Sequence, residues 1–274
     1  MRLLKHRLFW PLAALVTLLI INAINNPNFA RITVRDGQLY GALIDILRQS
    51  APLMLVALGM TIVIATRGID LSVGAVIGFT GVLVSVLIAW AGWHPLAAFA
   101  LSLAVAASFG AGMGLAVHYL QVPAFIVTLA GMFLARGGAS VITQDSVPVS
   151  HEFYDWISDL IIRLPGGGRL SFIGLLMVAV FIVGALVAHR TRFGSYVYAL
   201  GGNPVSASLM GVPVARTTIG VYMVSSTLAA LAGIVFSLYT SAGYPLAAVG
   251  VELDAISAVV IGGTLLTGGY GFVL

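Results

Sequence analysis

The sequence predicts an all-α protein, a polytopic bundle of helices that is integral to a membrane. Of its 274 residues, 60% are hydrophobic and only 8% are charged, whereas soluble domains contain about 25% charged residues. The apolar residues gather in about eight runs, most of them close to the roughly 20-residue length that crosses a bilayer. The 32 glycines would allow close packing of the helices. We therefore expect a single transmembrane domain over residues 1–274.

The apolar runs follow one another along the chain. Residues 8–24 are long for the core of a signal peptide and lack a small-x-small cleavage site, so we interpret them as the first span. A polar stretch at 25–50 follows. The later runs lie at 52–66, 73–92, 95–119, 123–142, 172–188, 219–239 and 255–266. Several are short or interrupted by glycine, so we expect one or two broken or re-entrant helices that line a cavity.

The arginines favour a cytoplasmic N-terminus. If the spans alternate from there, Arg190, Arg192 and Arg216 closely flank one inside loop, as the excess of basic residues in cytoplasmic loops requires. Arg136 is the one basic residue within a span. We expect its side chain to snorkel towards the outer end of that span.

Composition excludes several kinds of chemistry. The chain contains no cysteine and has Lys5 as its only lysine, so it has no thiolate site and no Walker A phosphate loop. Any ATP used in its work is therefore hydrolysed by another chain. The five histidines are scattered, and no nucleophile motif is present. The sequence predicts no metal site, no cofactor and no catalytic residue.

The loop at 189–218 contains the signals of a short helix. Asn203 is a good N-cap, Pro204 suits the first helical position, and Gly211 with Pro213 ends the helix, while Gly201 and Gly202 loosen the chain before it. A helix of about seven residues is unstable alone in water. It therefore rests either on lipid or on a cytoplasmic partner, and the residues leave both options open.

Two further segments place acids beside apolar runs. Asp70 and Ser72 stand between the spans at 52–66 and 73–92, either as a helix cap or as a polar bend that lines the route of a polar solute. Glu252 and Asp254 precede the last run in a similar way. An offset of 184 residues aligns Asp70 and residues 76–78 with Asp254 and residues 260–262, so an internal repeat is one interpretation.

Four stretches together resemble the permease subunits of bacterial ribose-type sugar ABC importers. They are GIDLSVG at 68–74, PAFIVTL at 123–129 with Met132, Arg136 and Gly137, the segment 202–212, and residues 252–264. The resemblance covers nearly the whole chain. It is closest to a permease subunit of the galactofuranose importer, through residues 165–171, 188–194 and 232–237.

The resemblance implies roles for particular residues. The short helix would be the coupling helix that docks on the ATPase, comprising Gly202, Asn203, Pro204, Ser206, Ala207, Leu209, Met210, Gly211 and Val212. The candidates for the translocation path are Asp70, Ser72, Thr128, Glu252 and Asp254. The chain itself would be a transport subunit and not an enzyme.

The resemblance also implies a multi-pass protein of the bacterial inner membrane and a set of partners. These are an ABC ATPase subunit at the cytoplasmic face, a second permease that is identical or a sister chain, and a periplasmic sugar-binding protein. The binding protein would deliver sugar to residues 143–171 and the loop near Tyr244. Lipid surrounds the spans, and no nucleic acid is expected.

Two positions depart from the family pattern. The family usually has glycine where Arg67 stands, so we expect a less compact bend there or an arginine that meets lipid phosphate. The family also continues beyond the position of Leu274 into further membrane helices, so we expect this sequence to lack those C-terminal helices.

Two other classes of function compete with an importer subunit. An ion-coupled secondary transporter of a small polar solute would need a membrane-buried acid, and Asp70, Glu252 and Asp254 are the candidates. An intramembrane enzyme would need a nucleophile and a base, for which the sequence shows no pair.

Overall fold

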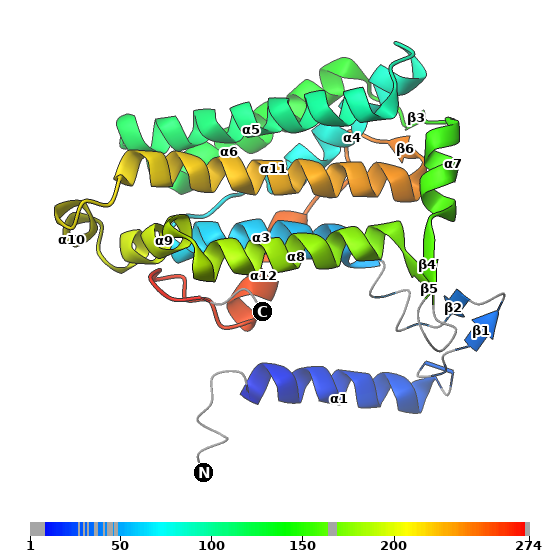
Figure 1. Ribbon diagram of the computed structural model, residues 1–274, viewed down its shortest axis with the longest axis horizontal. Coiled ribbons are helices and arrows are strands. Elements are labelled where there is room, and N and C mark those ends of the chain that lie inside the picture. The colour runs from blue at the N-terminus through cyan, green and yellow to red at the C-terminus, as the bar shows by residue number, and fades with distance from the viewer. Residues whose placement is uncertain are drawn as a thin grey trace.

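The computed structural model describes residues 9–26, 28–29, 31, 33–35, 38–40, 42, 46, 49–163 and 169–271. Helices dominate these residues, which confirms the predicted all-α class. The main helices lie side by side in a bundle, while α1 (Phe9–Asn25) lies apart from them (Figure 1). The helices of the bundle are α3 (Ala51–Ala65), α4 (Val73–Ala89), α5 (Pro95–Tyr119), α6 (Ala124–Ile142), α8 (Phe172–Arg190), α11 (Val214–Thr240) and the shorter α12 (Val251–Ile261).

Short elements gather at the two ends of the bundle (Figure 1). One end carries α9 (Arg192–Gly202) and α10 (Pro204–Leu209), and the other carries α7 (Glu152–Asp159), β3 (Val147–Pro148) and β6 (Ala242–Gly243). We call these the α10 end and the α7 end. The strands form only antiparallel pairs: β3 with β6, β1 (Thr33–Arg35) with β2 (Gln38–Tyr40), and β4 (Ile161–Arg163) with β5 (Arg169–Ser171).

The predicted spans correspond to helices, but of unequal length. Four helices, α5, α6, α8 and α11, are long and apolar enough to cross a membrane in the part of the chain that the structure describes. The helices at 11–25, 51–65 and 73–89 are apolar but shorter. The last span, expected at 255–266, is instead the 11-residue helix α12. It starts earlier because Gly250, in a left-handed conformation with φ of 89°, is the residue just before its first turn. Gly262 follows its last residue.

The centre of the bundle is α4, most of whose residues are buried. It packs against α11, α5, α6 and α12, and α11 also packs along α3 and α5. Small residues make this close packing possible. A methyl group at Gly110 of α5 would collide with the backbone of α11 at Tyr222, whereas one at Gly112 would meet nothing.

The chain turns back into the bundle after α3. Asp70, beyond the end of α3, bonds to Ser225 of α11, and Ser225 also lies against Gly59 in the middle of α3. Residues 66–72 therefore return to the level of Gly59 before α4 begins. Residues 66–72 thus form a non-helical bend between two separate helices.

A second segment turns back after α11. Residues 243–252 run along α4: Gly243 lies near Gly81, Pro245 near Gly78, and Ala248 and Glu252 near Gly74. Helix α12 thus begins beside the first turn of α4. The amide of Gly269, after α12, donates to the carbonyl of Ala65 at 2.9 Å, so α12 leads towards the α10 end while α4 leads away from it.

Candidate functional site

The short helix α10 forms where the sequence signals placed it. The Oδ1 atom of Asn203 accepts hydrogen bonds from the amides of Val205 and Ser206, both at 3.0 Å. Pro204 is the first helical residue. Gly211 adopts φ of 81°, a left-handed conformation that glycine favours. The predicted capped helix is therefore confirmed in its start and its end.

Helix α10 presents apolar side chains to the outside. Val205, Leu209 and Met210 are 69%, 85% and 73% exposed. Ala207 is fully buried and holds the helix to the rest of the chain. The amide of Val212 donates to the carbonyl of Ala207 at 3.0 Å, which closes the turn. Val205, Leu209 and Met210 thus form an exposed apolar patch, which we call the apolar knob.

The α10 end is connected to the turn after α3. Gly201 and Gly202, expected to loosen the chain, instead form the last turn of α9. Gly201 lies so close to the carbonyl of Ala65 that a methyl group there would collide with it. Arg67 donates from Nε to the carbonyl of Gly201 at 2.6 Å and from Nη2 to that of Gly202.

The unusual Arg67 therefore binds protein carbonyls, where we had expected a looser bend or a lipid phosphate. Its φ of 67° is left-handed, a conformation that glycine adopts more readily than residues with a side chain. The bend remains compact because the amide of Gly68 also donates to Val63 at 3.1 Å.

Asp70 lies completely buried within the bundle. Its Oδ1 accepts from the amide and the hydroxyl of Ser72, at 2.9 and 2.6 Å. Its Oδ2 accepts from the hydroxyl of Ser225 at 2.7 Å. The carboxylate thus fixes Ser72, the residue before α4, and also joins the bend to α11, so that both of its oxygens are engaged.

Thr128 brings α6 to the same bend. Its hydroxyl lies 3.2 Å from the carbonyl of Ile69 and 2.9 Å from that of Ala124. Like Ser72 and Asp70, Thr128 is buried. Three of the five predicted path residues therefore meet in one polar cluster inside the bundle.

The other two path residues lie in the first turn of α12 and differ from each other. Glu252 is half-buried against Gly74 of α4, and its Oε2 is buried without a hydrogen bond from the described residues. Asp254 is exposed. The proposed repeat is wrong in register, because Asp70 precedes α4 and is buried, whereas Asp254 lies within α12.

Arg136 does not snorkel, contrary to our expectation. Its Nη1 donates to the carbonyls of Pro245 and Ala247, at 2.7 and 2.8 Å. Non-helical backbone inside a membrane needs such partners, and the returning segment supplies bare carbonyls close to α6. The local sequence around Arg136 contains no sign of these partners, which lie more than one hundred residues away.

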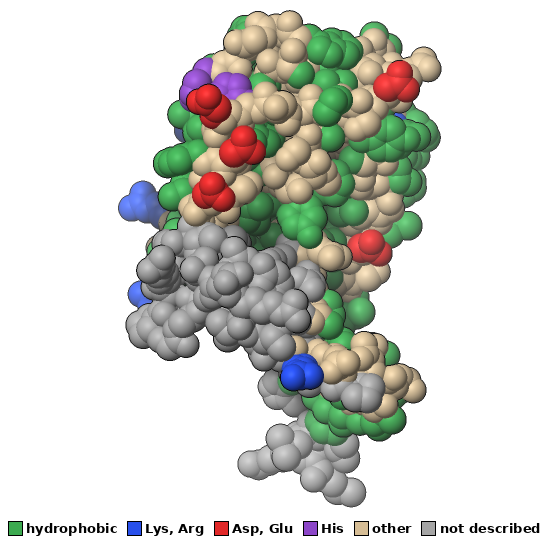
Figure 2. Space-filling model, turned by 90° about the vertical axis from the view of Figure 1, so that its right-hand side faces the viewer, with side chains coloured by type: hydrophobic (Ala, Val, Ile, Leu, Met, Phe, Trp, Pro, Cys, Tyr) green, Lys and Arg blue, Asp and Glu red, His purple; other side chains and the backbone are tan. Residues whose placement is uncertain are grey.

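The α7 end has a different character. Acidic side chains lie in a row on this end of the molecule (Figure 2), where α7 carries exposed Glu152, Asp155 and Asp159. On the inner side of α7, Tyr154 lies 3.2 Å from the hydroxyl of Ser237. Burial raises the pKa of the Tyr154 phenol, so it stays protonated and uncharged at neutral pH.

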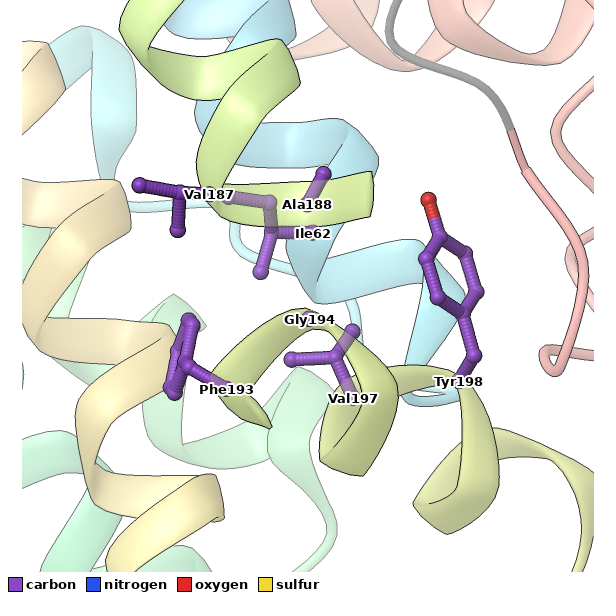
Figure 3. A pocket seen from close by; sticks show the side chains of 7 residues that line it. All are labelled: Ile62, Val187, Ala188, Phe193, Gly194, Val197 and Tyr198. Atoms are coloured by element: carbon purple, nitrogen blue, oxygen red, sulfur yellow. The ribbon is translucent and has the colours of Figure 1, made fainter. Parts of the chain in front are cut away.

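A small pocket opens near the α10 end, between α3, α8 and α9 (Figure 3). Its lining is Ile62, Val187, Ala188, Phe193, Gly194, Val197 and Tyr198. These side chains are apolar apart from one phenol. The pocket therefore offers little to a polar solute, and the polar cluster inside the bundle is the better candidate for a path.

Comparison with known proteins agrees with this architecture. Residues 42–272 match the family described as branched-chain amino acid transport system / permease component. The inner membrane ABC transporter permease protein YjfF of Escherichia coli K12 is 57% identical over 230 residues, which cover 84% of this chain and 70% of that protein. No solved structure matches.

Two import permeases are also similar. The fructose import permease protein FruG of Bifidobacterium longum is 40% identical over 271 residues, covering 96% of this chain and 78% of FruG. The ribose import permease protein RbsC of E. coli K12 is 40% identical over 266 residues, covering 95% and 78% of the two chains. We expected closest resemblance to a permease subunit of a galactofuranose importer; the galactofuranose transporter permease protein YtfT of E. coli K12 is 34% identical over 281 residues. This chain belongs to the branched-chain amino acid transport system / permease component family and is a multi-pass protein of the inner membrane.

Proposed function

We propose that this chain is the membrane-spanning permease subunit of an ATP-driven ABC importer that carries a sugar into the cytoplasm. The observation that carries the proposal is α10, a capped helix whose apolar knob of Val205, Leu209 and Met210 is exposed. Exposed apolar clusters rimmed by polar residues are typical of protein interfaces. The partner would be the ATPase subunit, since the chain has no phosphate loop of its own.

The substrate class is supported by the names of the relatives. FruG and RbsC are named for fructose and ribose at 40% identity, and YtfT for galactofuranose at 34%. We therefore propose a monosaccharide, with galactofuranose as one candidate among several. A second permease, identical or a sister chain, would complete the transmembrane unit.

The proposed orientation places the α10 end in the cytoplasm. That end carries Arg67, Arg190, Arg192 and Arg216, as the positive-inside rule requires. The acidic α7 end would then face a periplasmic sugar-binding protein. Lipid would surround the exposed apolar faces of the helices.

The contacts at the α10 end suggest how docking is transmitted. Helix α9 leads directly into α10, and Gly201 at the end of α9 lies against the end of α3. Arg67 ties the same turn to the bend that bears Asp70. A push on α10 would thus reach the polar cluster of Asp70, Ser72 and Thr128, which we propose as part of the sugar path together with Glu252 and Asp254.

The coupling role can be tested with a charge on the apolar knob. Leu209→Glu should leave the permease inserted but reduce sugar uptake more than about tenfold. Docking would bury the new carboxylate against the apolar surface of the ATPase, at a large desolvation cost. Leu120→Glu is a matched control, since Leu120 is also exposed, at 71%, in the turn between α5 and α6. Asn203→Leu, which removes the cap, should likewise uncouple ATP hydrolysis from uptake.

The readouts are uptake of labelled sugar, ATP hydrolysis and co-purification of the ATPase. Normal coupled transport by both Leu209→Glu and Asn203→Leu would refute docking through α10. Equal losses in Leu120→Glu would show that any added charge at this end is harmful.

One observation favours a second function, ion-coupled secondary transport. Glu252 has a buried carboxylate oxygen without a hydrogen bond from the described residues, and a membrane-buried acid can carry a coupling ion. Uptake by cells that depends on a proton or sodium gradient and survives inactivation of the ATPase would support this alternative.

A further inference from the structure

The segment between α11 and α12 runs along α4 with only isolated turn hydrogen bonds. It lies along α4 at two glycines. A methyl group at Gly78 would be 2.9 Å from the Pro245 carbonyl and 2.9 Å from Nη1 of Arg136. One at Gly74 would collide with the Glu252 carboxylate and the carbonyl of Ala248. The two glycines thus make room for both the segment and the charged groups beside it.

Arg136 is the side chain that holds this segment. One nitrogen, Nη1, donates to the carbonyls of Pro245 and Ala247 at 2.7 and 2.8 Å, five to seven residues before Glu252. The backbone at Ala248, with φ of 58°, and at Gly250, with φ of 89°, then turns the chain into α12. The position of Glu252 therefore depends on the bonds of Arg136.

Glu252 has an unused acceptor in this place. Its Oε2 is buried and accepts no hydrogen bond from the described residues, and a buried oxygen of this kind costs free energy until a donor reaches it. Arg136 binds the carbonyls of the same returning segment, so a positive charge lies on the same side of α4 as the carboxylate. Opposite charges on one segment partly offset each other, which favours an uncharged donor over an ion.

We propose, on the basis of the function proposed above, that Oε2 of Glu252 binds a hydroxyl group of the transported solute. Arg136 is then a positioning residue: it holds the returning segment in the groove of α4 and so places the carboxylate. The ligand class is a neutral, hydroxyl-bearing solute such as an unmodified monosaccharide. Charged sugars and amino acids would gain less from this pair.

The test measures the equilibrium binding of ribose and fructose to the purified complex of the permease and its ATPase. Saturation-transfer NMR is the readout, because it detects weak ligands. Glu252→Ala should weaken binding at least about tenfold, the loss typical of a hydrogen bond to a charged group. Glu252→Gln, which keeps an acceptor oxygen and the shape, should recover part of that loss. Ser257→Ala, on the same helix but exposed, should bind as the wild type does.

The role of Arg136 is tested by a double-mutant cycle. If it acts through Glu252, Arg136→Ala should weaken binding, and the double variant with Glu252→Ala should bind no more weakly than Glu252→Ala alone. A purely structural role would instead add a second, independent loss. Additive losses would overturn the positioning role.

The outcomes also separate this inference from the proposed function. A wild-type complex that imports neither sugar nor galactofuranose would count against the proposed function. Import by the wild type, with unchanged binding in both Glu252 variants at normal membrane levels, would overturn the assignment of Glu252.

Discussion

At the scale of single residues, the interior acid Asp70 joins two distant parts of the chain. It is fully buried, and its oxygens accept from the Ser72 amide, the Ser72 hydroxyl and the Ser225 hydroxyl. The last of these bonds joins residues 155 positions apart. Asp70 therefore holds the bend to α11 in addition to any contact with solute.

Replacing Asp70 by alanine should destabilise the protein strongly. Three donors would be left in the interior, and each buried unsatisfied group costs about 1–3 kcal/mol. We expect a clearly lower melting temperature in detergent and less protein in the membrane. Asp254→Ala, at an exposed position, should change the free energy of unfolding by less than about 0.5 kcal/mol. A wild-type melting temperature for Asp70→Ala would return Asp70 to the role of a dispensable cap.

At the scale of elements, the packing of α5 on α11 depends on glycines. Gly110 faces the backbone of α11 at Tyr222, and Gly114 faces it at Ile219. These glycines are one helical turn apart, so they lie on the same side of α5. Gly112 lies between them but faces open space.

Alanine at Gly110 and alanine at Gly112 should have opposite effects. Gly110→Ala should lower the melting temperature and the amount of folded permease, because the new methyl group collides with backbone that cannot rotate away. Gly112→Ala should be neutral or stabilising by up to about 1 kcal/mol, since alanine favours a helix more than glycine does. Equal melting temperatures for the two variants would contradict the close approach of α5 and α11.

At the scale of the whole molecule, the two ends are built for different tasks. The α10 end joins α3, α9 and the turn after α12 through Arg67 and Gly201. The α7 end is closed by the pairing of β3 with β6, in which Pro148 lies opposite Ala242. A permease that opens in turn to either side of the membrane would have to open this α7 end once in each transport cycle.

Cross-linking can test whether the α7 end opens there. The chain has no cysteine, so Pro148→Cys with Ala242→Cys introduces the only pair. Residues opposite each other in antiparallel strands have Cβ atoms about 5 Å apart, which a short bis-methanethiosulfonate reagent can span by forming one disulfide with each cysteine. We expect sugar uptake to fall to background on cross-linking and to return when a reductant cleaves the link. Each single cysteine is a control, and undiminished uptake by the cross-linked protein would place the opening elsewhere.

Local features of the sequence determined the membrane class, the approximate spans and α10. A high apolar and low charged content indicates a membrane environment without any knowledge of the fold. A cap such as Asn203 bonds to amides only two and three residues away. These predictions therefore needed no knowledge of distant contacts. The helices α7 and α9 were not predicted. The cap of α7 is His151, whose ring nitrogen accepts from the amide of Phe153 at 3.1 Å, and histidine is not among the common N-cap residues.

Only the tertiary structure decided what the interior polar residues contact. It paired Asp70 with Ser225, turned Arg136 from the membrane surface to the carbonyls of Pro245 and Ala247, and separated buried Glu252 from exposed Asp254. It also shifted the last helix to Val251–Ile261. The physical reason is that a buried polar group takes whichever partner the fold brings within reach, and these partners come from segments far away in the sequence.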